Sequence, residues 1–270
     1  MPASNLKMNV IRAGRAVLTT RPIMGIIDRL GLKSTLSRSY WWLLYRASGG
    51  EYTQQVGDVS TTFHASSVSS FRHYHTLVGE RPVIADLLSR LDTDDVFYDV
   101  GAYIGSYTCL AATHLTDGQV VSFEPRANHA VEIEANLSRN DLQADVRRVA
   151  LSDEAGETAI SASARLSESG PQRVSLERGD RLVERGSVPA PTVVKIDVEG
   201  VEAKVIRGME ATLSRPDCRL VYCEVHPTFL DEFDSTEEEV LTGLEACGFT
   251  VETIHTRGQE YIIRAEKESQ

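Results

Sequence analysis

The fold is decided by the stretch Val96-Phe97-Tyr98-Asp99-Val100-Gly101-Ala102-Tyr103-Ile104-Gly105. Its apolar first half predicts a buried strand, and its two glycines predict a tight turn that opens a helix. In an open α/β sheet, that junction is where a nucleotide-like cofactor binds. Glycines also allow simple helix–strand packing in any α/β protein. The acids around the turn are therefore needed to distinguish cofactor binding from packing alone.

A second acid follows the next predicted strand, where residues 119–123 lead into Glu124-Pro125. A carboxylate at this position can accept hydrogen bonds from both hydroxyls of an adenosine ribose. The turn itself lacks the G-x-G-x-x-G spacing of dinucleotide-binding proteins, and Asp99 precedes its first glycine. An acid there repels a pyrophosphate but attracts a cofactor that carries an ammonium and a sulfonium. The residues therefore favour S-adenosylmethionine over NAD.

Composition narrows the class of protein. A chain of 270 residues accommodates one well-buried domain and an appendage. Its formal net charge of -11 opposes a nucleic-acid partner, because phosphate binding needs clustered Lys and Arg. The four cysteines lie in predicted apolar segments without metal-ligand spacing, and no secretory signal or membrane-spanning run is apparent. These features predict a reduced, cytoplasmic protein.

Residues 1–75 are expected to form an N-terminal helical extension followed by a hairpin or lid region. An amphipathic pattern runs from Val10 to Leu30, and the aromatic run at 40–45 lies between Arg38 and Arg46. Such a segment packs on its own domain or on a second subunit of a homo-oligomer, or residues 38–46 contact a membrane surface peripherally. Residues 51–75 alternate as a hairpin does, which would put His73 and His75 on one strand face, as in a metal site. Without a carboxylate or thiolate at suitable spacing, surface or lid histidines are the favoured interpretation.

Residues 76–270 are expected to form the main domain, beginning with a helix over 76–91. From there strands and helices alternate, which predicts a seven-stranded sheet, parallel except for its last pair. The expected strands are 96–100, 119–123, 145–149, 193–197, 219–225, 250–255 and 260–265, and the expected helices are 106–115, 128–140, 201–213 and 236–247. The polar interval 152–191 is too long for an ordinary connection and is expected to carry function or minor structure of its own.

A second group of acids follows the strand 193–197, where Asp197, Glu199 and Glu202 open the next helix. This strand is expected beside strand 96–100, so its acids face the acceptor of the methyl group. The strand 219–225 adds Glu224 and His226 at the same edge. A carboxylate or His226 suits a general base for a hydroxyl acceptor, and the acids could instead hold a divalent cation, although no metal is predicted. The structural alternatives are a solvated first helical turn and a satisfied histidine.

Taken together, the motifs resemble the FkbM-type S-adenosylmethionine-dependent methyltransferases over roughly residues 77–227. The motifs are Asp99-Val100-Gly101-Ala102-Tyr103-Ile104-Gly105-Ser106-Tyr107-Thr108, Phe123-Glu124-Pro125, Ala150-Leu151-Ser152-Asp153, Lys195-Ile196-Asp197-Val198-Glu199-Gly200-Val201-Glu202 and Arg207-Gly208. The resemblance implies a class I, Rossmann-like α/β fold and O-methylation of sugars, polyketides or other metabolites. Tyr103 departs from the small or amide residue usual in that family, and its ring could stack over the cofactor or narrow the pocket.

The expected function is an S-adenosylmethionine-dependent O-methyltransferase that acts on a hydroxyl or carboxyl of a glycan or small metabolite. The alternative is a binding or regulatory module that keeps the fold without catalysis. The expected cofactor-binding residues are Asp99, Gly101, Tyr103, Gly105, Glu124, Ser152 and Asp153, and the expected catalytic residues are Asp197, Glu199 and His226. Residues 1–76 match nothing specific, so the identity of the acceptor does not follow from the sequence.

Overall fold

The computed structural model describes residues 33–160, 166–167 and 172–268. The amphipathic pattern predicted between Val10 and Leu30 lies outside these residues. The chain divides into two compact units, one of Met1–Gln55 with Ser60–Arg81 and one of Val56–Val59 with Pro82–Gln270. No helix in the described ranges is long and apolar enough to cross a membrane.

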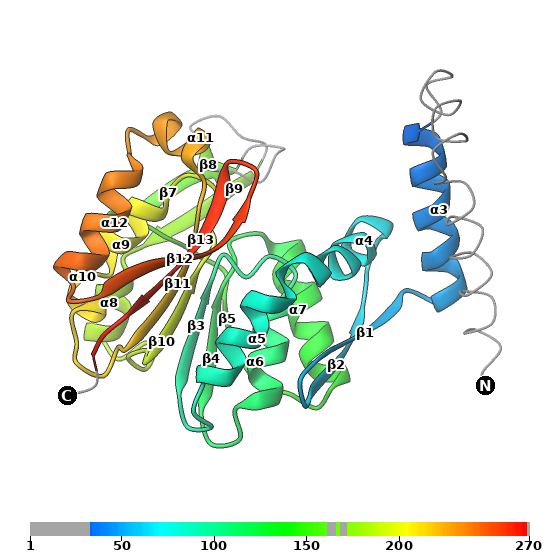
Figure 1. Ribbon diagram of the computed structural model, residues 1–270, viewed down its shortest axis with the longest axis horizontal. Coiled ribbons are helices and arrows are strands. Elements are labelled where there is room, and N and C mark those ends of the chain that lie inside the picture. Colours follow the sequence, from blue (N-terminus) through cyan, green and yellow to red (C-terminus); the bar gives the residue numbers. More distant parts are fainter. Residues whose placement is uncertain (1–32, 161–165, 168–171, 269–270) are drawn as a thin grey trace. The chain divides into compact units, whose positions relative to one another are not determined.

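The described part of the first unit contains helices α3 and α4, a 3-10 turn and a two-stranded sheet (Figure 1). Its elements are α3 (Lys33–Ser48), β1 (Glu51–Val56), β2 (Val59–His64), α4 (Val68–Thr76) and η1 (Leu77–Glu80). The hairpin predicted over 51–75 therefore ends at β2, and its last part is helical. Ser67 caps α4 by accepting a hydrogen bond from the Ser70 amide, which starts a helix where the sequence alternation suggested a strand.

Aromatic rings form the core of this unit. Phe63 stacks on Tyr74 with ring centroids 4.5 Å apart, and both side chains are fully buried. The ring of His75 lies 4.1 Å from that of Tyr52 and 4.6 Å from that of Phe71. His75 thus packs in an aromatic cluster on a helix, which corrects the view of His73 and His75 as neighbours on one strand face. Such ring pairs add about 0.5 to 1.5 kcal/mol each beyond their burial.

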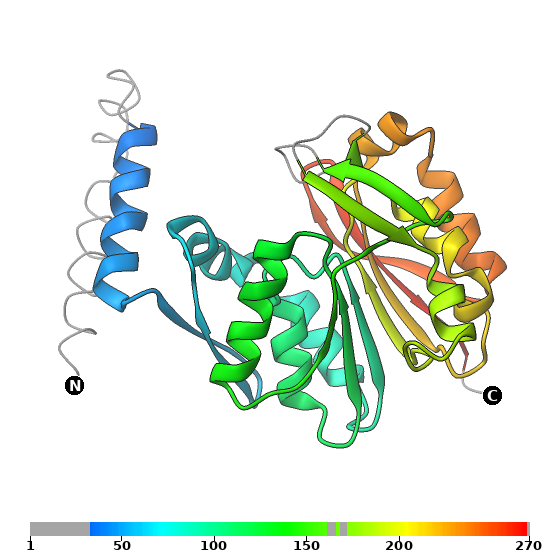
Figure 2. The ribbon, with the colours of Figure 1, turned by 180° about the vertical axis from the view of Figure 1, so that it is seen from behind.

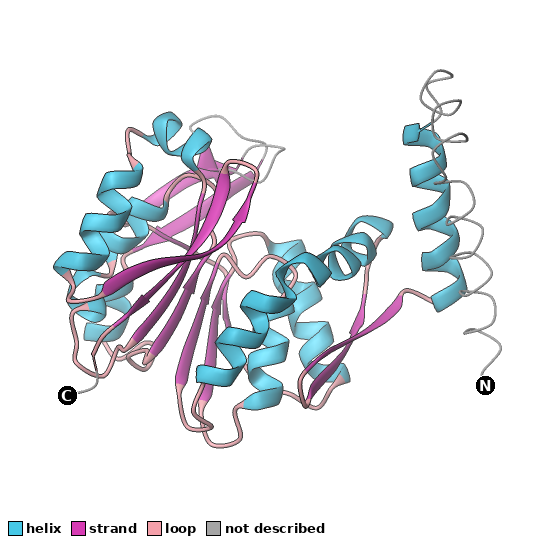
Figure 3. Ribbon diagram, viewed as in Figure 1, coloured by secondary structure: helices cyan, strands magenta, loops and turns pink. Residues whose placement is uncertain are grey.

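The second unit is built on a seven-stranded sheet in the order β12-β13-β11-β10-β3-β4-β5 (Figure 3). The strands are β3 (Val96–Val100), β4 (Gln119–Phe123), β5 (Asp145–Arg147), β10 (Val193–Ile196), β11 (Leu220–Val225), β12 (Thr250–Arg257) and β13 (Glu260–Glu266). β13 runs antiparallel to both of its neighbours, whereas the other pairs are parallel. The strand order reverses between β3 and β10, and ligands of open α/β sheets bind at such a point.

Helices cover both faces of this sheet, with α5, α6 and α7 on one and α8, α9, α10 and α12 on the other (Figure 1). The helices are α5 (Arg81–Arg90), α6 (Ser106–His114), α7 (Ala127–Arg139), α8 (Gly179–Glu184), α9 (Glu202–Gly208), α10 (Glu210–Leu213), α11 (Pro227–Leu230) and α12 (Glu237–Ala246), with a 3-10 turn η2 (Asp231–Phe233). The helix predicted over 76–91 begins only at Arg81, because Pro82 is tolerated in a first turn but not in a helix interior.

The helix predicted over 201–213 is interrupted at Met209. Gly208 explains the interruption: glycine weakens a helix, and a Cβ on this residue would lie 2.0 Å from the carbonyl oxygen of Ser152. The polar interval 152–191 contributes β7, β8 and β9 to a small sheet in the order β6-β9-β7-β8, in which β6 precedes the interval (Figure 2). The strands of this sheet are β6 (Ala150–Leu151), β7 (Gly156–Ile160), β8 (Leu166–Ser167) and β9 (Gln172–Glu177). All four cysteines are buried free thiols.

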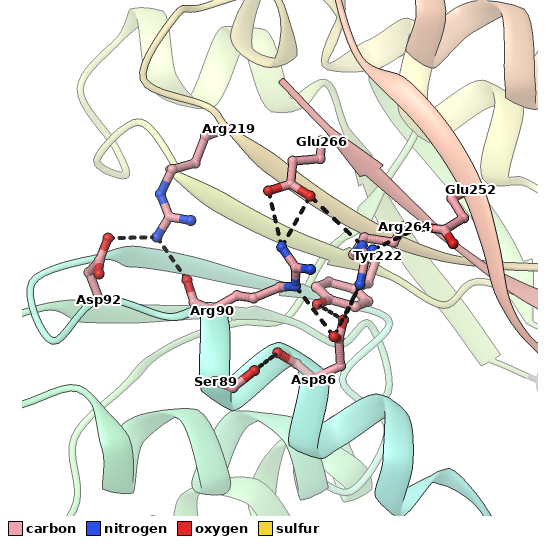
Figure 4. A network of polar contacts seen from close by, with 9 residues as sticks. All are labelled: Asp86, Ser89, Arg90, Asp92, Arg219, Tyr222, Glu252, Arg264 and Glu266. Atoms are coloured by element: carbon pink, nitrogen blue, oxygen red, sulfur yellow. Dashed lines mark hydrogen bonds and ion pairs between the residues drawn. The ribbon is translucent and has the colours of Figure 1, made fainter. Parts of the chain in front are cut away.

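A polar network fastens α5 to the antiparallel part of the main sheet (Figure 4). Asp86 accepts a hydrogen bond from the Tyr222 hydroxyl at 2.5 Å, and Arg264 donates to both of its oxygens at 3.0 and 3.1 Å. Arg90 joins Asp86 to Glu266. Burial alone would raise the pKa of Asp86, but the hydrogen bonds from Tyr222 and Arg264 hold it below the ordinary value of 3.8.

We expect Asp86→Asn to lower the free energy of unfolding by about 1 to 2 kcal/mol at pH 7, a figure reduced for the partial exposure of the group. Because the folded-state pKa of Asp86 is lowered, this stabilisation is present above the ordinary value of 3.8 and is lost as the pH falls through the folded value. Urea unfolding at pH 7 and pH 3 measures both effects. Glu252→Gln, which removes an exposed partner of Arg264, serves as control and should change little. Equal losses at both pH values would contradict the ionic part of the explanation.

Candidate active site

The candidate site lies at the carboxyl ends of β3, β4, β10 and β11, where the strand order reverses. The sequence placed two groups of residues here, a glycine turn after β3 and a set of acids after β10 and β11. Register confirms that these strands are neighbours, since Val100 pairs with both Phe123 and Ile196. The structure therefore brings the two groups to one edge of the sheet.

The glycine turn needs its glycines for backbone reasons. Gly101 has φ 82°, and a Cβ there would lie 1.9 Å from the carbonyl oxygen of Asp197. Gly105 has φ 83°, and its Cβ would lie 2.9 Å from the Ile133 side chain. The amide of Gly101 donates to the carbonyl of Phe123 at 3.0 Å. The turn is thus held against both neighbouring strands, and a larger residue does not fit.

The turn ends in the N-terminus of α6, which has no side-chain cap because Gly105 occupies the cap position. Ser106, the first residue of the helix, is 4 % exposed, and its Oγ has no hydrogen-bond partner within the described residues. Uncapped helical amides attract a negative group. A buried hydroxyl without a partner is uncommon in folded proteins, and a polar ligand atom would satisfy it. Sequence reasoning missed Ser106 because a serine at this position has no distinctive pattern.

Asp99 lies beneath the turn and is fully buried. Its carboxylate accepts a hydrogen bond from the Thr108 hydroxyl at 2.6 Å and forms an ion pair with Lys195 at 3.4 Å. The structure therefore places Asp99 in an internal polar network that supports the turn from below. Lys195 and Thr108 were absent from the predicted site, although the parallel register that pairs Lys195 with Asp99 is the signal that could have found the lysine.

Glu124 joins the glycine turn to the loop that follows β4. Its carboxylate accepts hydrogen bonds from the amides of Tyr103 and Arg126, both at 2.9 Å. Nδ1 of His129 lies 3.4 Å from the same carboxylate. Tyr103 is one of the few non-glycine residues with positive φ, at 51°, and its ring meets that of His129 edge to face at 4.5 Å. Burial and the charges of nearby acids raise the pKa of Tyr103, so its hydroxyl is neutral.

Ser152 and Asp153, the last two predicted cofactor residues, contact α9. Asp153 pairs with Arg207 at 3.0 Å, and its carbonyl accepts a hydrogen bond from Arg178. The Ser152 hydroxyl donates to the Asp153 carboxylate at 3.2 Å. These contacts bind the start of the polar interval to the end of α9. They give both residues a structural role and do not join them to the glycine turn.

The acids after β10 and β11 form the second part of the site. Asp197, Glu224 and His226 offer ligand atoms that all lie within 4.8 Å of one another. Lys195 forms an ion pair with Asp197 at 3.1 Å, and Arg257 pairs with Glu224 at 2.9 Å. Burial alone would lower the pKa of Lys195, but the charges of Asp197 and Asp99 raise it, which keeps the ammonium charged.

Glu202 controls the state of His226. The side chain of Glu202 is fully buried, and its carboxylate accepts hydrogen bonds from Nδ1 of His226 at 2.6 Å and from the Gly200 amide at 3.2 Å. Burial alone would lower the pKa of His226, but this bond and the charges of Asp197, Glu202 and Glu224 raise it to about 9. Glu202 is thus buried and bonded to His226, which corrects the alternative of a solvated helical turn for this residue.

Glu199, by contrast, is exposed in the loop between β10 and α9. Burial is the largest cause of the raised pKa of Tyr103, followed among the acids by Glu132, Glu124 and Glu199. The charge of Glu199 therefore acts on the glycine turn. The neighbouring Gly200 has φ 90°, and a Cβ there would lie 2.7 Å from Phe229.

The strand order, with a glycine turn after the first parallel strand and an acid after the second, defines a class I, Rossmann-like methyltransferase fold. A family model described as the methyltransferase FkbM domain matches residues 99–251. The chain therefore belongs to the FkbM methyltransferase family, and it is a methyltransferase. The matched residues include both parts of the site.

Two relatives of known function agree with this assignment. The chain is 33 % identical over 180 residues to the hexuronic acid methyltransferase AglP of Haloferax volcanii, covering 64 % of this chain and 73 % of AglP. It is 29 % identical over 197 residues to the 31-O-demethyl-FK506 methyltransferase FkbM of Streptomyces tacrolimicus, covering 58 % and 73 %. A crystal structure of a methyltransferase FkbM from Methylobacillus flagellatus KT shares the fold, with a TM-score of 0.51, 14 % identity and coverage of 84 % of this chain and 53 % of that one.

We expect Gly101→Ala to destabilise the protein by about 3 kcal/mol or more, because positive φ and overpacking against the Asp197 carbonyl both oppose a side chain. Gly258→Ala is the matched control, since Gly258 also has positive φ but nothing lies within 4 Å of its Cβ position. That control should lose only about 1 to 2 kcal/mol. Urea unfolding followed by circular dichroism gives both values, and similar losses would show that the close approach is not limiting.

Proposed function

We propose that this chain transfers the methyl group of S-adenosylmethionine to an oxygen of a glycan or a small metabolite. The observation that carries the proposal is the carboxylate of Glu124, fixed by the amides of Tyr103 and Arg126 beside the glycine turn. A carboxylate has about four lone-pair sites, so Glu124 can accept ribose hydroxyls in addition to these two amides. The binding of the cofactor by the other residues predicted around it is also part of this proposal.

The turn also fits the other end of such a cofactor. The uncapped amides of α6 and the partnerless Oγ of Ser106 suit its carboxylate. The acids of the site suit its two positive charges, the ammonium and the sulfonium. Asp99 acts from below by holding Thr108 and Lys195, which makes it a support of the turn in this proposal. Gly101 and Gly105 provide the space that a larger residue would fill.

When bound, the sulfonium supplies an electrophilic methyl group. The chain has to align the acceptor oxygen and accept its proton, and alignment alone can contribute about 7 to 11 kcal/mol. Asp197, Glu199 and His226 are the proposed acceptor residues. Because Glu202 keeps His226 protonated near neutral pH, His226 suits a hydrogen-bond donor to the acceptor, and Asp197 is the better base.

The acceptor class rests on the relatives. AglP acts on a hexuronic acid and FkbM on 31-O-demethyl-FK506, as their names state. A hydroxyl acceptor loses a proton during transfer and needs a base, whereas an ionised carboxyl acceptor does not. We therefore propose a sugar or sugar-acid acceptor. The face of α3 with Trp42 at 52 % and Leu43 at 45 % exposure remains the proposed place for a membrane surface or a second subunit.

Calorimetric titration with S-adenosylhomocysteine tests the cofactor without knowledge of the acceptor. We expect micromolar binding by the wild-type chain and a loss of about 1.5 to 3 kcal/mol in Glu124→Ala, since hydrogen bonds to a charged group are removed. Glu134→Ala removes an exposed carboxylate of α7 and is the matched control. Absence of binding at millimolar ligand would replace the proposal with a non-catalytic module, and undiminished binding by Glu124→Ala would remove the ribose role.

Asp197→Asn should lower turnover by about 10²- to 10⁴-fold on a hydroxyl acceptor while binding S-adenosylhomocysteine as the wild type does. Transfer of a radiolabelled methyl group to a panel of sugars and uronic acids measures this. Glu199→Gln is the companion variant, and we expect a smaller loss because Glu199 is exposed. Unchanged transfer by Asp197→Asn would exclude this carboxylate as the base.

A further inference from the structure

Three side chains beside the glycine turn have the composition of a metal site. Asp197, Glu224 and His226 place their ligand atoms within 4.8 Å of one another, and Glu224 and His226 are buried. We propose that this trio binds a divalent cation of the manganese type, which then takes an oxygen of the methyl acceptor as a further ligand. The acceptor part rests on the proposed function, whereas binding of the cation does not. With the cation bound, Asp197 and His226 would serve as its ligands, and acidification of the acceptor hydroxyl by the cation would take the place of the base and donor roles proposed for them above.

The sheet itself positions the three ligands. Ile196 pairs with Cys223 in the parallel ladder of β10 and β11, so the next residues, Asp197 and Glu224, stand opposite each other. Glu224 lies in β11, and Asp197 and His226 are the residues that directly follow β10 and β11. Attachment to the strand ends limits the freedom of all three ligands, which is what a cation site requires.

His226 is presented as metal-ligating histidines usually are. Its Nδ1 donates to Glu202 at 2.6 Å, and its side chain is 6 % exposed. Ligating histidines generally give one ring N–H to a carboxylate and bind the metal through the other nitrogen. Because Nδ1 of His226 is bonded to Glu202, Nε2 is the ring nitrogen that would bind a metal ion.

The balance of charged groups in the cluster also favours a bound cation. The cluster contains the carboxylates of Asp99, Asp197, Glu202 and Glu224, and it contains the cations of Lys195 and Arg257. The carboxylates thus outnumber the lysine and arginine cations by four to two in a largely buried volume, where unbalanced charge is costly. A divalent cation offsets this excess of acidic groups.

The ion pairs already present are compatible with a cation. Lys195 lies 3.1 Å from one oxygen of Asp197, and Arg257 lies 2.9 Å from one oxygen of Glu224. Each carboxylate has about four lone-pair sites, so one donor does not exhaust it. Carboxylate oxygens suit Mg²⁺ and Mn²⁺, and an imidazole nitrogen moves the preference toward the first-row metals. Three protein ligands leave open positions for an acceptor oxygen and water.

The test uses the full chain after treatment with a chelator. Titration with MnCl₂, followed by the electron paramagnetic resonance of free Mn²⁺, should show one site in the wild type. Asp197→Asn, Glu224→Gln and His226→Gln should each weaken binding at least about tenfold, and Glu202→Gln should weaken it about 10- to 100-fold through loss of the partner of His226. Glu134→Gln, a surface carboxylate on α7, should bind as the wild type does.

Each outcome has one meaning. Weakening confined to the trio and Glu202 supports the site, provided that the variants keep wild-type circular dichroism. No binding by the wild type at millimolar Mn²⁺, or equal binding by Asp197→Asn, overturns it. The cofactor titration separates the two proposals: Mn²⁺ binding without S-adenosylhomocysteine binding keeps the cation site and rejects methyl transfer, and the reverse result rejects the cation site alone.

Discussion

The close passage of Gly101 beside the carbonyl of Asp197 is the constraint on which the site depends. It lets β3 and β10 end at the same level and allows the Asp197 amide to donate to the Val100 carbonyl at 2.9 Å. The glycine turn and the loop that carries Asp197 are therefore parts of one backbone contact. Any change that separates them alters both at once.

Electrostatic balance is the second requirement of this edge. Lys195 lies between Asp99 and Asp197 and over the ring of Tyr107 at 4.5 Å, so one buried cation serves two carboxylates on neighbouring strands. Isolated charges of this kind would be costly in the interior, and pairing is what makes them tolerable. Glu202 and His226 repeat the arrangement on the far side of Asp197.

The sequence predicted the parts of this architecture that depend on local pattern. Strands 96–100 and 119–123 were placed at their observed bounds, and the neighbouring position of the strand before Asp197 followed from topology. The contacts of Asp99, the pairing of Glu202 with His226 and the partnerless hydroxyl of Ser106 could not be predicted, because they depend on side-chain rotamers and on which strands are in register. The helix at His73 was missed because one capping serine outweighed the alternation before it.

The two faces of β11 make different contacts, apolar on one side and polar on the other. Val221, Cys223 and Val225 belong to the apolar core beneath α9 and α12, whereas the alternate residues Tyr222 and Glu224 enter polar networks. Substitutions on the polar side leave that apolar core in place. The polar contacts of this strand can therefore change while the packing of the core beneath it stays the same, which is how one scaffold can carry different sites.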